Sequence, residues 1–425
     1  MIKHHLNDWL AYLEKLHPST IDMGLGRLQQ VAKKLQLAKP APLVITVTGT
    51  NGKGSTCAFI AALLESQGLS VGIYTSPHLI HYQERIAINQ QLVSEDSICH
   101  AFEKIEQARG NISLTYFEFG TLAAFLLFQQ AHLDAVVLEV GLGGRLDAVN
   151  LVDADIAVVT SIGIDHQEWL GNTRESVGFE KAGIFRENHP AVCGDSNPPN
   201  TLIEQAKQKK APFYVRDKDF TLTLEDNHWQ WQGINKQGTA QTLSNIPLLN
   251  LPMNNAALAL QVFSLLDFPW QEHKLINALQ HVKVMGRLER HVINYHNKKC
   301  TLLLDVAHNP HAANFLANYL KSHPTTGKRY AVFGLLADKD LEGVINPLAN
   351  LIESWAVAPL STPRSNTAEH LAQKLQEKEL HVTLHNSIVK AIEAQLDSIS
   401  PEDEIIIFGS FYVVADALQW LNTFK

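Results

Sequence analysis

The stretch "LVITVTGTNGKGSTCAFIAALLESQG", residues 43–68, decides the fold of the first half of this chain. It opens with an apolar run typical of a buried strand and passes through a Gly-rich turn into a helix that closes at Gly68. Glycines let backbone N–H groups converge on a phosphate, the helix N-terminus is positive, and Lys53 adds a charge. The pattern predicts a nucleotide phosphate site. The alternative is a plain Gly-rich turn between a strand and a helix.

This loop departs from the usual phosphate-binding pattern at two positions. Val47 stands where the pattern has its first Gly, and Gly54 follows Lys53 where the pattern has a hydroxyl. Ser55 comes one residue later and on a helix should point about 100° away from the standard position. We therefore hypothesise that Ser76, at the end of the next strand, supplies the missing oxygen.

Composition narrows the class of protein. The chain has 425 residues, of which 45% are apolar, and this indicates roughly two or three globular domains. The balance of 35 basic against 43 acidic residues argues against a general nucleic-acid or anionic-membrane binder. The N-terminal stretch lacks an apolar signal core, and no segment is long enough to span a bilayer. The cysteines form no Cys-x-x-Cys pair: Cys57, Cys99, Cys193 and Cys300. We expect a cytoplasmic protein with reduced thiols.

Apolar strands alternate with helical segments in two series, which is typical of α/β domains with parallel sheets. Residues 4–36 predict two helices with a break at Pro18, and 211–250 predict a small antiparallel patch. A second series starts near residue 300 and contains four predicted strands. The stretch "KVMGRLERHV" is the expected boundary, so that the domains are 1–284 and 285–425.

Polar side chains that suit a metal ion end or follow the strands of the first domain. They are Ser76, Glu139, Asp165, His166 and Lys181. Phosphoryl transfer needs magnesium and ligands to hold it, and the carboxyl ends of parallel strands meet at one edge of a sheet. These side chains are therefore expected above Lys53.

Each of these residues has an alternative interpretation. Ser76 alone is a typical turn residue, His166 a satisfied or exposed histidine, and Lys181 a surface or salt-bridge lysine. Glu139 is harder to dismiss, because a carboxylate after an apolar run is costly unless it is paired or metal-bound. "GLGGRLD", Gly141–Asp147, has the wrong spacing for a dinucleotide fingerprint, and we expect a flexible substrate loop there.

In the second domain "DVAHNPHAA" combines a buried strand end with polar side chains. Asp305 ends the strand, and the alternative for Asn309-Pro310 is a helix cap with Pro at the first helical position. His308 is then an ordinary loop residue. Arg287 at the domain junction is expected to bind phosphates, and the alternative is an interdomain salt bridge.

Taken together, these stretches resemble one family, the folylpolyglutamate synthases, and most closely the bacterial bifunctional dihydrofolate synthase/folylpolyglutamate synthases of the Mur ligase superfamily. The matching motifs run in order from about residue 18 to 415: "TGTNGKGS", "TSPHLIHYQERI", "TYFEFGTLAAF", "LEVGLGGRLDAVN", "TSIGIDHQEWLG", "EKAGIFR", "GRLER", "DVAHNPHAA" and "FGSFYVVADAL". One position departs, since Tyr412 stands where relatives often carry His.

The resemblance implies a P-loop ATPase domain with a largely parallel sheet plus a smaller C-terminal Rossmann-like α/β domain. It implies an ATP-dependent ligase that adds L-glutamate to dihydropteroate and to the γ-carboxylate of reduced folates through an acyl phosphate. It also implies a monomer. A monofunctional folylpolyglutamate synthase, a P-loop ATPase or kinase without ligase activity, and a nucleotide-binding regulator stay open as alternatives.

The resemblance also carries residue roles. The ATP contacts it implies are Thr50, Asn51, Gly52, Lys53, Gly54, Ser55, Asn255, Arg287 and Asp305. The ligands it implies for two Mg²⁺ ions are Ser76, Glu139, His166 and Lys181, the last of them carbamylated. The catalytic residues are Lys53, Lys181 and His308, the last beside the glutamate pocket. The pterin-site residues are Asp22, Met23, Gly24, Leu25, Thr115, Tyr116, Phe117 and Glu118.

Overall fold

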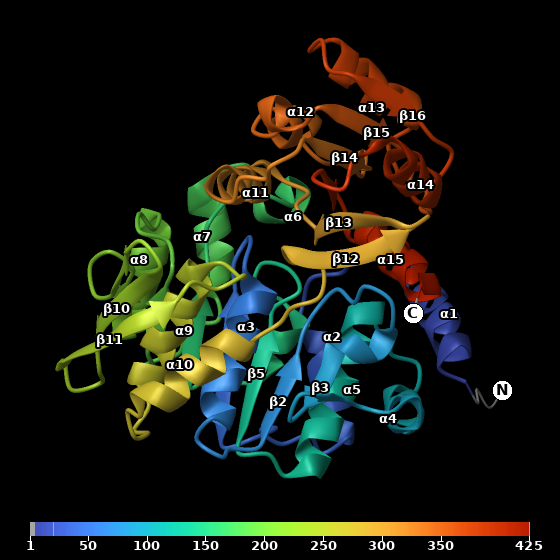
Figure 1. The fold of residues 1–425 in the computed structure, drawn as a ribbon. Helices are drawn as coiled ribbons and strands as arrows, with labels where there is room; N and C mark the ends of the chain where they lie inside the picture. Colours follow the sequence, from blue (N-terminus) through green and yellow to red (C-terminus); the bar gives the residue numbers. More distant parts are fainter. Residues whose placement is uncertain (1–4, 20, 425) are drawn as a thin grey trace. The chain divides into compact units, whose positions relative to one another are not determined.

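The chain divides between Lys283 and Val284 into two compact units. The computed structural model in Figure 1 describes residues 5–19 and 21–424. The boundary expected from the sequence, after residue 284, lies one residue further on. Each unit has a sheet of its own.

The N-terminal unit is built on an eight-stranded sheet with the order β4-β3-β2-β5-β1-β6-β7-β8. The strands are β1 Leu43–Thr48, β2 Val71–Tyr74, β3 Ile86–Ile88, β4 Gln91–Leu92, β5 Ala135–Glu139, β6 Ile156–Val159, β7 Ala191–Cys193 and β8 Phe213–Val215. Along this order, each neighbouring pair from β2 through β5, β1, β6 and β7 to β8 is parallel. The β2–β3 and β3–β4 pairs at the other edge are antiparallel. The largely parallel sheet predicted from the sequence is confirmed. Strand β1 lies between β5 and β6, so its carboxyl end is flanked by theirs.

Ten α-helices of this unit lie within the described residues. They are α1 Leu6–Leu16, α2 Gly26–Lys34, α3 Lys53–Glu65, α4 Glu95–Arg109, α5 Tyr116–Ala131, α6 Gln167–Leu170, α7 Arg174–Ala182, α8 Asn200–Gln208, α9 Met253–Ser264 and α10 Glu272–His281. Helices α3 and α5 are buried almost all round, as their apolar sequences predict, and α3 packs against α9. The first helix ends just before Pro18, as expected.

A small antiparallel sheet of β9 Thr221–Leu224, β10 His228–Ile234 and β11 Ala240–Pro247 follows β8. Trp229 and Trp231 of β10 are fully buried under it. The alternation of polar and apolar residues predicted this patch correctly.

The C-terminal unit has a six-stranded sheet with the order β12-β13-β17-β14-β15-β16. Its strands are β12 Glu289–Tyr295, β13 Lys298–Asp305, β14 Arg329–Phe333, β15 Ser354–Val357, β16 Val382–Leu384 and β17 Glu404–Phe408. Its helices are α11 Pro310–Ser322, α12 Leu341–Ile345, α13 Ala368–Gln376, α14 Ile388–Ser398 and α15 Phe411–Leu421.

The prediction of four strands in this unit was wrong, because it missed the two edge strands β12 and β16. Edge strands have one free side, so their residues alternate or stay exposed and lack the apolar run of a central strand. The four central strands were predicted correctly. Within residues 5–19 and 21–424, no helix combines the length and apolar character needed to cross a bilayer.

Candidate active site

The Gly-rich loop joins the end of β1 to the start of α3. Gly52 has φ +84°, a left-handed conformation that favours glycine, and a Cβ there would lie 2.7 Å from Asn255 Oδ1. Asn255, on α9, therefore packs directly against the loop. No side chain caps α3, so its first N–H groups face the loop as a site for an anion.

The loop is held in place by the end of the neighbouring strand β6. Thr50 N donates a hydrogen bond to the backbone oxygen of Ser161 at 2.9 Å. Asn51 N donates one to the Ser161 side-chain Oγ at 3.1 Å. Thr160 Oγ1 donates to Asn51 O at 2.6 Å, and Lys53 Nζ donates to Gly49 O at 3.1 Å. These contacts hold the loop against the end of β6. Sequence reasoning missed Thr160 and Ser161, although both stand in the quoted "TSIGIDH".

Glu139, Ser76 and Gly54 meet at one carboxylate oxygen. Glu139 ends β5 and is only 4% exposed, and its Oε2 accepts a hydrogen bond from Ser76 N at 3.0 Å. A Cβ at Gly54 would lie 3.6 Å from the same oxygen. Ser55, by contrast, points into the core and is 3% exposed. The buried carboxylate beside a phosphate loop is the kind of donor that Mg²⁺ prefers, so these residues fit a divalent cation.

Lys181 lies in the last turn of α7 and is 3% exposed. Burial, followed by repulsion from the charge of Lys53, lowers the pKa of its ammonium to about 7, against the attraction of Asp165 and Asp147. The surface-lysine alternative is therefore wrong. A large share of this amine is neutral near pH 7.

Asp165 and His166 lie at the start of α6. His166 has φ +51° and a side chain that is 45% exposed, and its Nε2 lies 4.0 Å from Asp165 Oδ2. Across the described residues, no group of three or more His, Cys, Asp or Glu side chains is arranged to hold a metal ion. A metal site here thus depends on other donors, such as the Ser76 hydroxyl or a modified Lys181.

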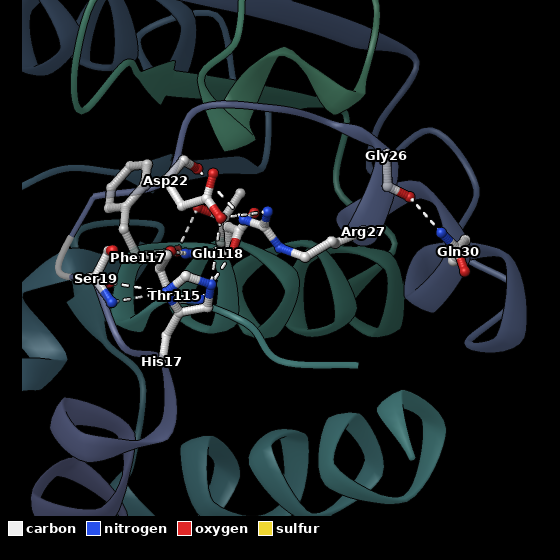
Figure 2. Close-up of polar contacts among 10 residues, drawn as sticks. His17, Ser19, Asp22, Gly26, Arg27, Gln30, Thr115, Phe117 and Glu118 are labelled. Atoms are coloured by element: carbon white, nitrogen blue, oxygen red, sulfur yellow. Dashed lines mark hydrogen bonds and ion pairs between the residues drawn. The ribbon is translucent and has the colours of Figure 1, made fainter. Parts of the chain in front are cut away.

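The two segments expected at the pterin site are joined by an arginine (Figure 2). Arg27 donates from Nη1 to Asp22 Oδ2 at 2.6 Å and from Nη2 to Glu118 Oε1 at 2.9 Å. Glu118 Oε2 also accepts from Thr115 N at 2.7 Å, closing a capping box at the start of α5. Sequence reasoning missed Arg27, because nothing in the local pattern shows that these segments meet.

The loop Gly141–Asp147 lies against both of these segments and Lys181. A Cβ at Gly141 would be 2.7 Å from the ring of Phe117, and one at Gly143 would be 3.7 Å from Met23 Cε. A Cβ at Gly144 would lie 3.0 Å from Lys181 O. Thr48 donates to Gly143 O at 2.6 Å. The loop thus has neighbours on several sides, and the flexibility expected from the sequence stays a prediction.

Asp147 closes this loop and is buried. Its carboxylate accepts hydrogen bonds from Leu142 N at 2.8 Å and Val149 N at 2.9 Å, yet burial still raises its pKa to about 7. Sequence reasoning did not single out Asp147. Its signal was an acidic residue that follows a Gly-rich turn and opens an apolar stretch, "DAVNLV".

In the C-terminal unit two of the predicted residues lie near Phe411, the first residue of α15. The Arg287 guanidinium lies 5.0 Å from the Phe411 ring centre, and the His308 ring lies 5.9 Å away. Asp305 is 8% exposed and accepts from Leu288 N at 2.9 Å. Burial raises the pKa of this carboxyl, against the attraction of Arg287.

The start of α11 matches the helix-cap interpretation of "HNPH". Asn309 Oδ1 accepts from Ala312 N at 3.0 Å, and Pro310 is the first helical residue. His308 Nδ1 lies 2.8 Å from Val306 O. The cap prediction is confirmed.

Comparison with known proteins gives the family. Residues 47–260 match the Mur ligase middle domain, and residues 286–411 match the Mur ligase glutamate ligase domain. A dihydrofolate synthase/folylpolyglutamate synthase of Escherichia coli is 42% identical over 98% of this chain and 96% of its own. The structure of E. coli FolC in complex with DHPP and ADP superposes with a TM-score of 0.93 at 42% identity, covering 100% of this chain and 99% of that one. A bifunctional folylpolyglutamate synthase/dihydrofolate synthase with Mn, AMPPNP and L-glutamate bound gives a TM-score of 0.90 at 43% identity, over 99% of both chains. The chain therefore belongs to the Mur ligase family and, within it, to the dihydrofolate synthase/folylpolyglutamate synthases.

Proposed function

We propose that this protein uses ATP to join L-glutamate to dihydropteroate and to the γ-carboxylate of reduced folates. One observation carries the proposal: the loop Gly141–Asp147 lies close to Met23 and Phe117 on one side and to the backbone of Lys181 on the other. It thus links the acceptor segments to the surroundings of the phosphate loop. Relatives crystallised with ADP and DHPP, or with AMPPNP, Mn and L-glutamate, support the same assignment.

The reaction runs in two steps. An oxygen of the acceptor carboxylate attacks the γ-phosphorus of ATP, which gives an acyl phosphate and ADP. The amine of L-glutamate then attacks the acyl carbon, loses a proton and expels inorganic phosphate. Residues Thr50–Lys53 bind the phosphates through backbone N–H groups and the Lys53 ammonium, which stabilise the charge of the transferring group. A divalent cation supplies charge neutralisation at the phosphates when it is bound.

Ser76, Glu139, His166 and Lys181 are assigned to hold two Mg²⁺ ions, with Lys181 carbamylated. The neutral amine of Lys181 attacks CO₂ to form an N–C bond, and one proton is released. Its lowered pKa makes that form abundant at neutral pH. The carbamate replaces a cation that would repel the metal with an anion that attracts it, and the neighbouring charge of Lys53 becomes attractive.

The remaining assignments follow the two units. Residues 1–284 bind ATP and the acceptor, and Asn255, which packs against Gly52, contacts the nucleotide. Residues 285–425 contribute Arg287 and Asp305 to the nucleotide and His308 to L-glutamate. The enzyme is assigned as a cytoplasmic monomer, for which size-exclusion chromatography with light scattering is the direct check.

Product formation with two acceptors tests the proposal. ADP release over many turnovers should require L-glutamate together with dihydropteroate, and equally L-glutamate together with tetrahydrofolate. If tetrahydrofolate supported turnover and dihydropteroate did not, the protein would be a monofunctional folylpolyglutamate synthase. Continued turnover of ATP without L-glutamate would identify a kinase or ATPase, and ATP binding without turnover on any acceptor would identify a regulator.

A further inference from the structure

Arg85 is a buried cation without a carboxylate partner in the part of the chain that the structure describes. It ends the short 3₁₀ helix Tyr82–Arg85 and is 8% exposed. Its Nε donates to His78 Nδ1 at 2.9 Å, and this is a neutral partner. An imidazole nitrogen that accepts a hydrogen bond carries no proton, so His78 supplies no negative charge to Arg85. A buried charge of this kind is costly unless an anion compensates it.

The adjacent acid does not supply that anion. Both oxygens of Glu84 accept backbone hydrogen bonds, Oε2 from Leu79 N at 2.7 Å and Oε1 from Ile80 N at 2.8 Å and His81 N at 2.6 Å. Glu84 therefore serves the turn that precedes it. Two of the three guanidinium nitrogens of Arg85, Nη1 and Nη2, remain available to a ligand.

Two tyrosine rings hold the guanidinium in position. Its central carbon lies 5.4 Å from the ring centre of Tyr82 and 5.6 Å from that of Tyr116. The two rings are 5.8 Å apart and nearly perpendicular. The Tyr82 hydroxyl packs against Gly120 of α5. A Cβ on Gly120 would lie only 2.5 Å from that hydroxyl, so a larger residue would exclude the tyrosine. Cation–π contacts orient Arg85 but leave its net charge uncompensated.

The position of Arg85 relates it to both halves of the reaction. Tyr116 stands between Thr115 and Phe117, in the segment assigned to the acceptor. His78 comes two residues after Ser76, whose N–H binds Glu139 beside the phosphate loop. Arg85 thus contacts one residue of the acceptor segment and one that follows the proposed metal ligand.

We propose that Arg85 binds the acceptor carboxylate that becomes phosphorylated. This inference rests on the proposed function. The planar guanidinium matches a carboxylate in a two-pronged geometry, and both acceptors present such a group. A reduced folate also has an α-carboxylate that does not react, so the same chemistry has two sources that the experiment must separate.

Binding of dihydropteroate and of its analogue without the carboxylate tests the proposal directly. The wild type should prefer dihydropteroate by about 10- to 100-fold, the value of a charge-assisted pair. Arg85→Gln should remove this preference, keep the affinity for the analogue within about twofold, and leave AMPPNP binding unchanged. Arg85→Lys should keep part of it, because the charge remains without the fork. Retention of the full preference in Arg85→Gln, or an equal loss for both ligands, would overturn the proposal.

Arg109→Gln is the matched control. Arg109 is also a largely buried arginine of this unit, but its Nη2 lies 2.6 Å from Glu106 Oε1, so it has its own anion. This variant should keep the preference for dihydropteroate. If Arg85→Gln does not fold, Arg85→Lys with an unchanged preference would refute the proposal.

Kinetics with the two acceptors separates the carboxylates. Binding to the reacting carboxylate predicts that Arg85→Gln loses kcat/KM equally with dihydropteroate and tetrahydrofolate. A loss confined to tetrahydrofolate would move Arg85 to the α-carboxylate and overturn the assignment. A wild type that binds neither pterin would instead refute the proposed function.

Discussion

Two helices of this protein start directly after buried strands, and their first turns differ. Helix α3 begins after Gly52 without a side-chain cap, and the buried Lys181 nearby has its pKa lowered toward neutrality. Helix α11 begins after Asn309, whose side chain caps it, and Asp305 before it accepts two backbone N–H groups. The first turn of α3 leaves its backbone N–H donors and the charge of Lys53 for a ligand to satisfy. The first turn of α11 is satisfied by the side chain of Asn309. Substitutions near α3 should therefore affect activity, and substitutions at α11 should affect stability.

The largest effect is expected at Lys181. Lys181→Ala should lower the rate of ADP formation by roughly 1,000-fold, because a metal ligand and its charge are removed. Lys181→Arg should not restore the rate, since a guanidinium cannot take up CO₂. Native mass spectrometry of the wild type should show the mass of one added CO₂ that depends on bicarbonate. A wild-type-like rate in either variant would refute the role, and a crystal structure with a bare ammonium at full occupancy would refute the modification.

Asp147 should produce the next largest effect, as a dependence of stability on pH. Its folded-state pKa of about 7 lies above the ordinary value of 3.8, so the folded protein holds a proton that the unfolded chain has lost. The stability contributed by this group is full below pH 3.8 and is lost as the pH rises through about 7. The free energy of unfolding of Asp147→Asn should therefore rise by on the order of 4 kcal/mol relative to that of the wild type between pH 4 and 9.

Urea unfolding across this pH range measures that difference. The comparison with the wild type cancels the titrating groups that do not interact with Asp147; Lys181 is not one of them, because Asp147 attracts its ammonium. Asp217→Asn, at a carboxylate that is 57% exposed, is the control and should follow the wild type at every pH. If the difference in unfolding free energy between Asp147→Asn and the wild type did not change with pH, ionising Asp147 would not destabilise the folded protein and the prediction would be wrong.

Ser76 should produce a smaller effect, on the requirement for magnesium. Ser76→Ala should raise the Mg²⁺ concentration for half-maximal rate by about tenfold, the value of one lost oxygen ligand. Ser55→Ala should change it little, because Ser55 is buried and Ser76 N lies beside Glu139. If Ser55→Ala raised the required Mg²⁺ concentration more than Ser76→Ala did, the metal ligand would be Ser55 of the phosphate loop.

The parts of the site predicted from the residues alone lie on the Gly-rich strand–turn–helix unit or at the end of a buried strand. The loop from Gly49 to Lys53 was predicted because the apolar strand, the glycines and the lysine are contiguous. Glu139 was predicted because a carboxylate at the end of an apolar strand requires a partner. These signals are local, and a single sequence contains them.

The residues that were missed depend on contacts between distant segments. Arg27 joins Asp22 to Glu118, and Asp147 is unusual only because the folded chain buries it. The edge strands β12 and β16 were missed for a related reason, since exposure on one side removes the apolar run. Spacing along the chain shows none of these, because burial and partners are set by the tertiary fold.

The smallest effect is expected at Asn309, where the comparison of the two helix starts is tested from the other side. Asn309→Ala should lower the free energy of unfolding by about 1 kcal/mol, because the N–H of Ala312 loses its acceptor. Asn309→Ser should restore most of it, since Ser also caps helices, and Asn314→Ala in the same helix should matter less because its amide binds Pro310 O in an exposed position. Urea unfolding measures the stabilities, and the KM for L-glutamate is measured in parallel. If Asn309→Ala left stability unchanged but raised this KM and Asn309→Ser did not rescue it, the start of α11 would be a ligand site like the start of α3, and the distinction between the two helices would fail.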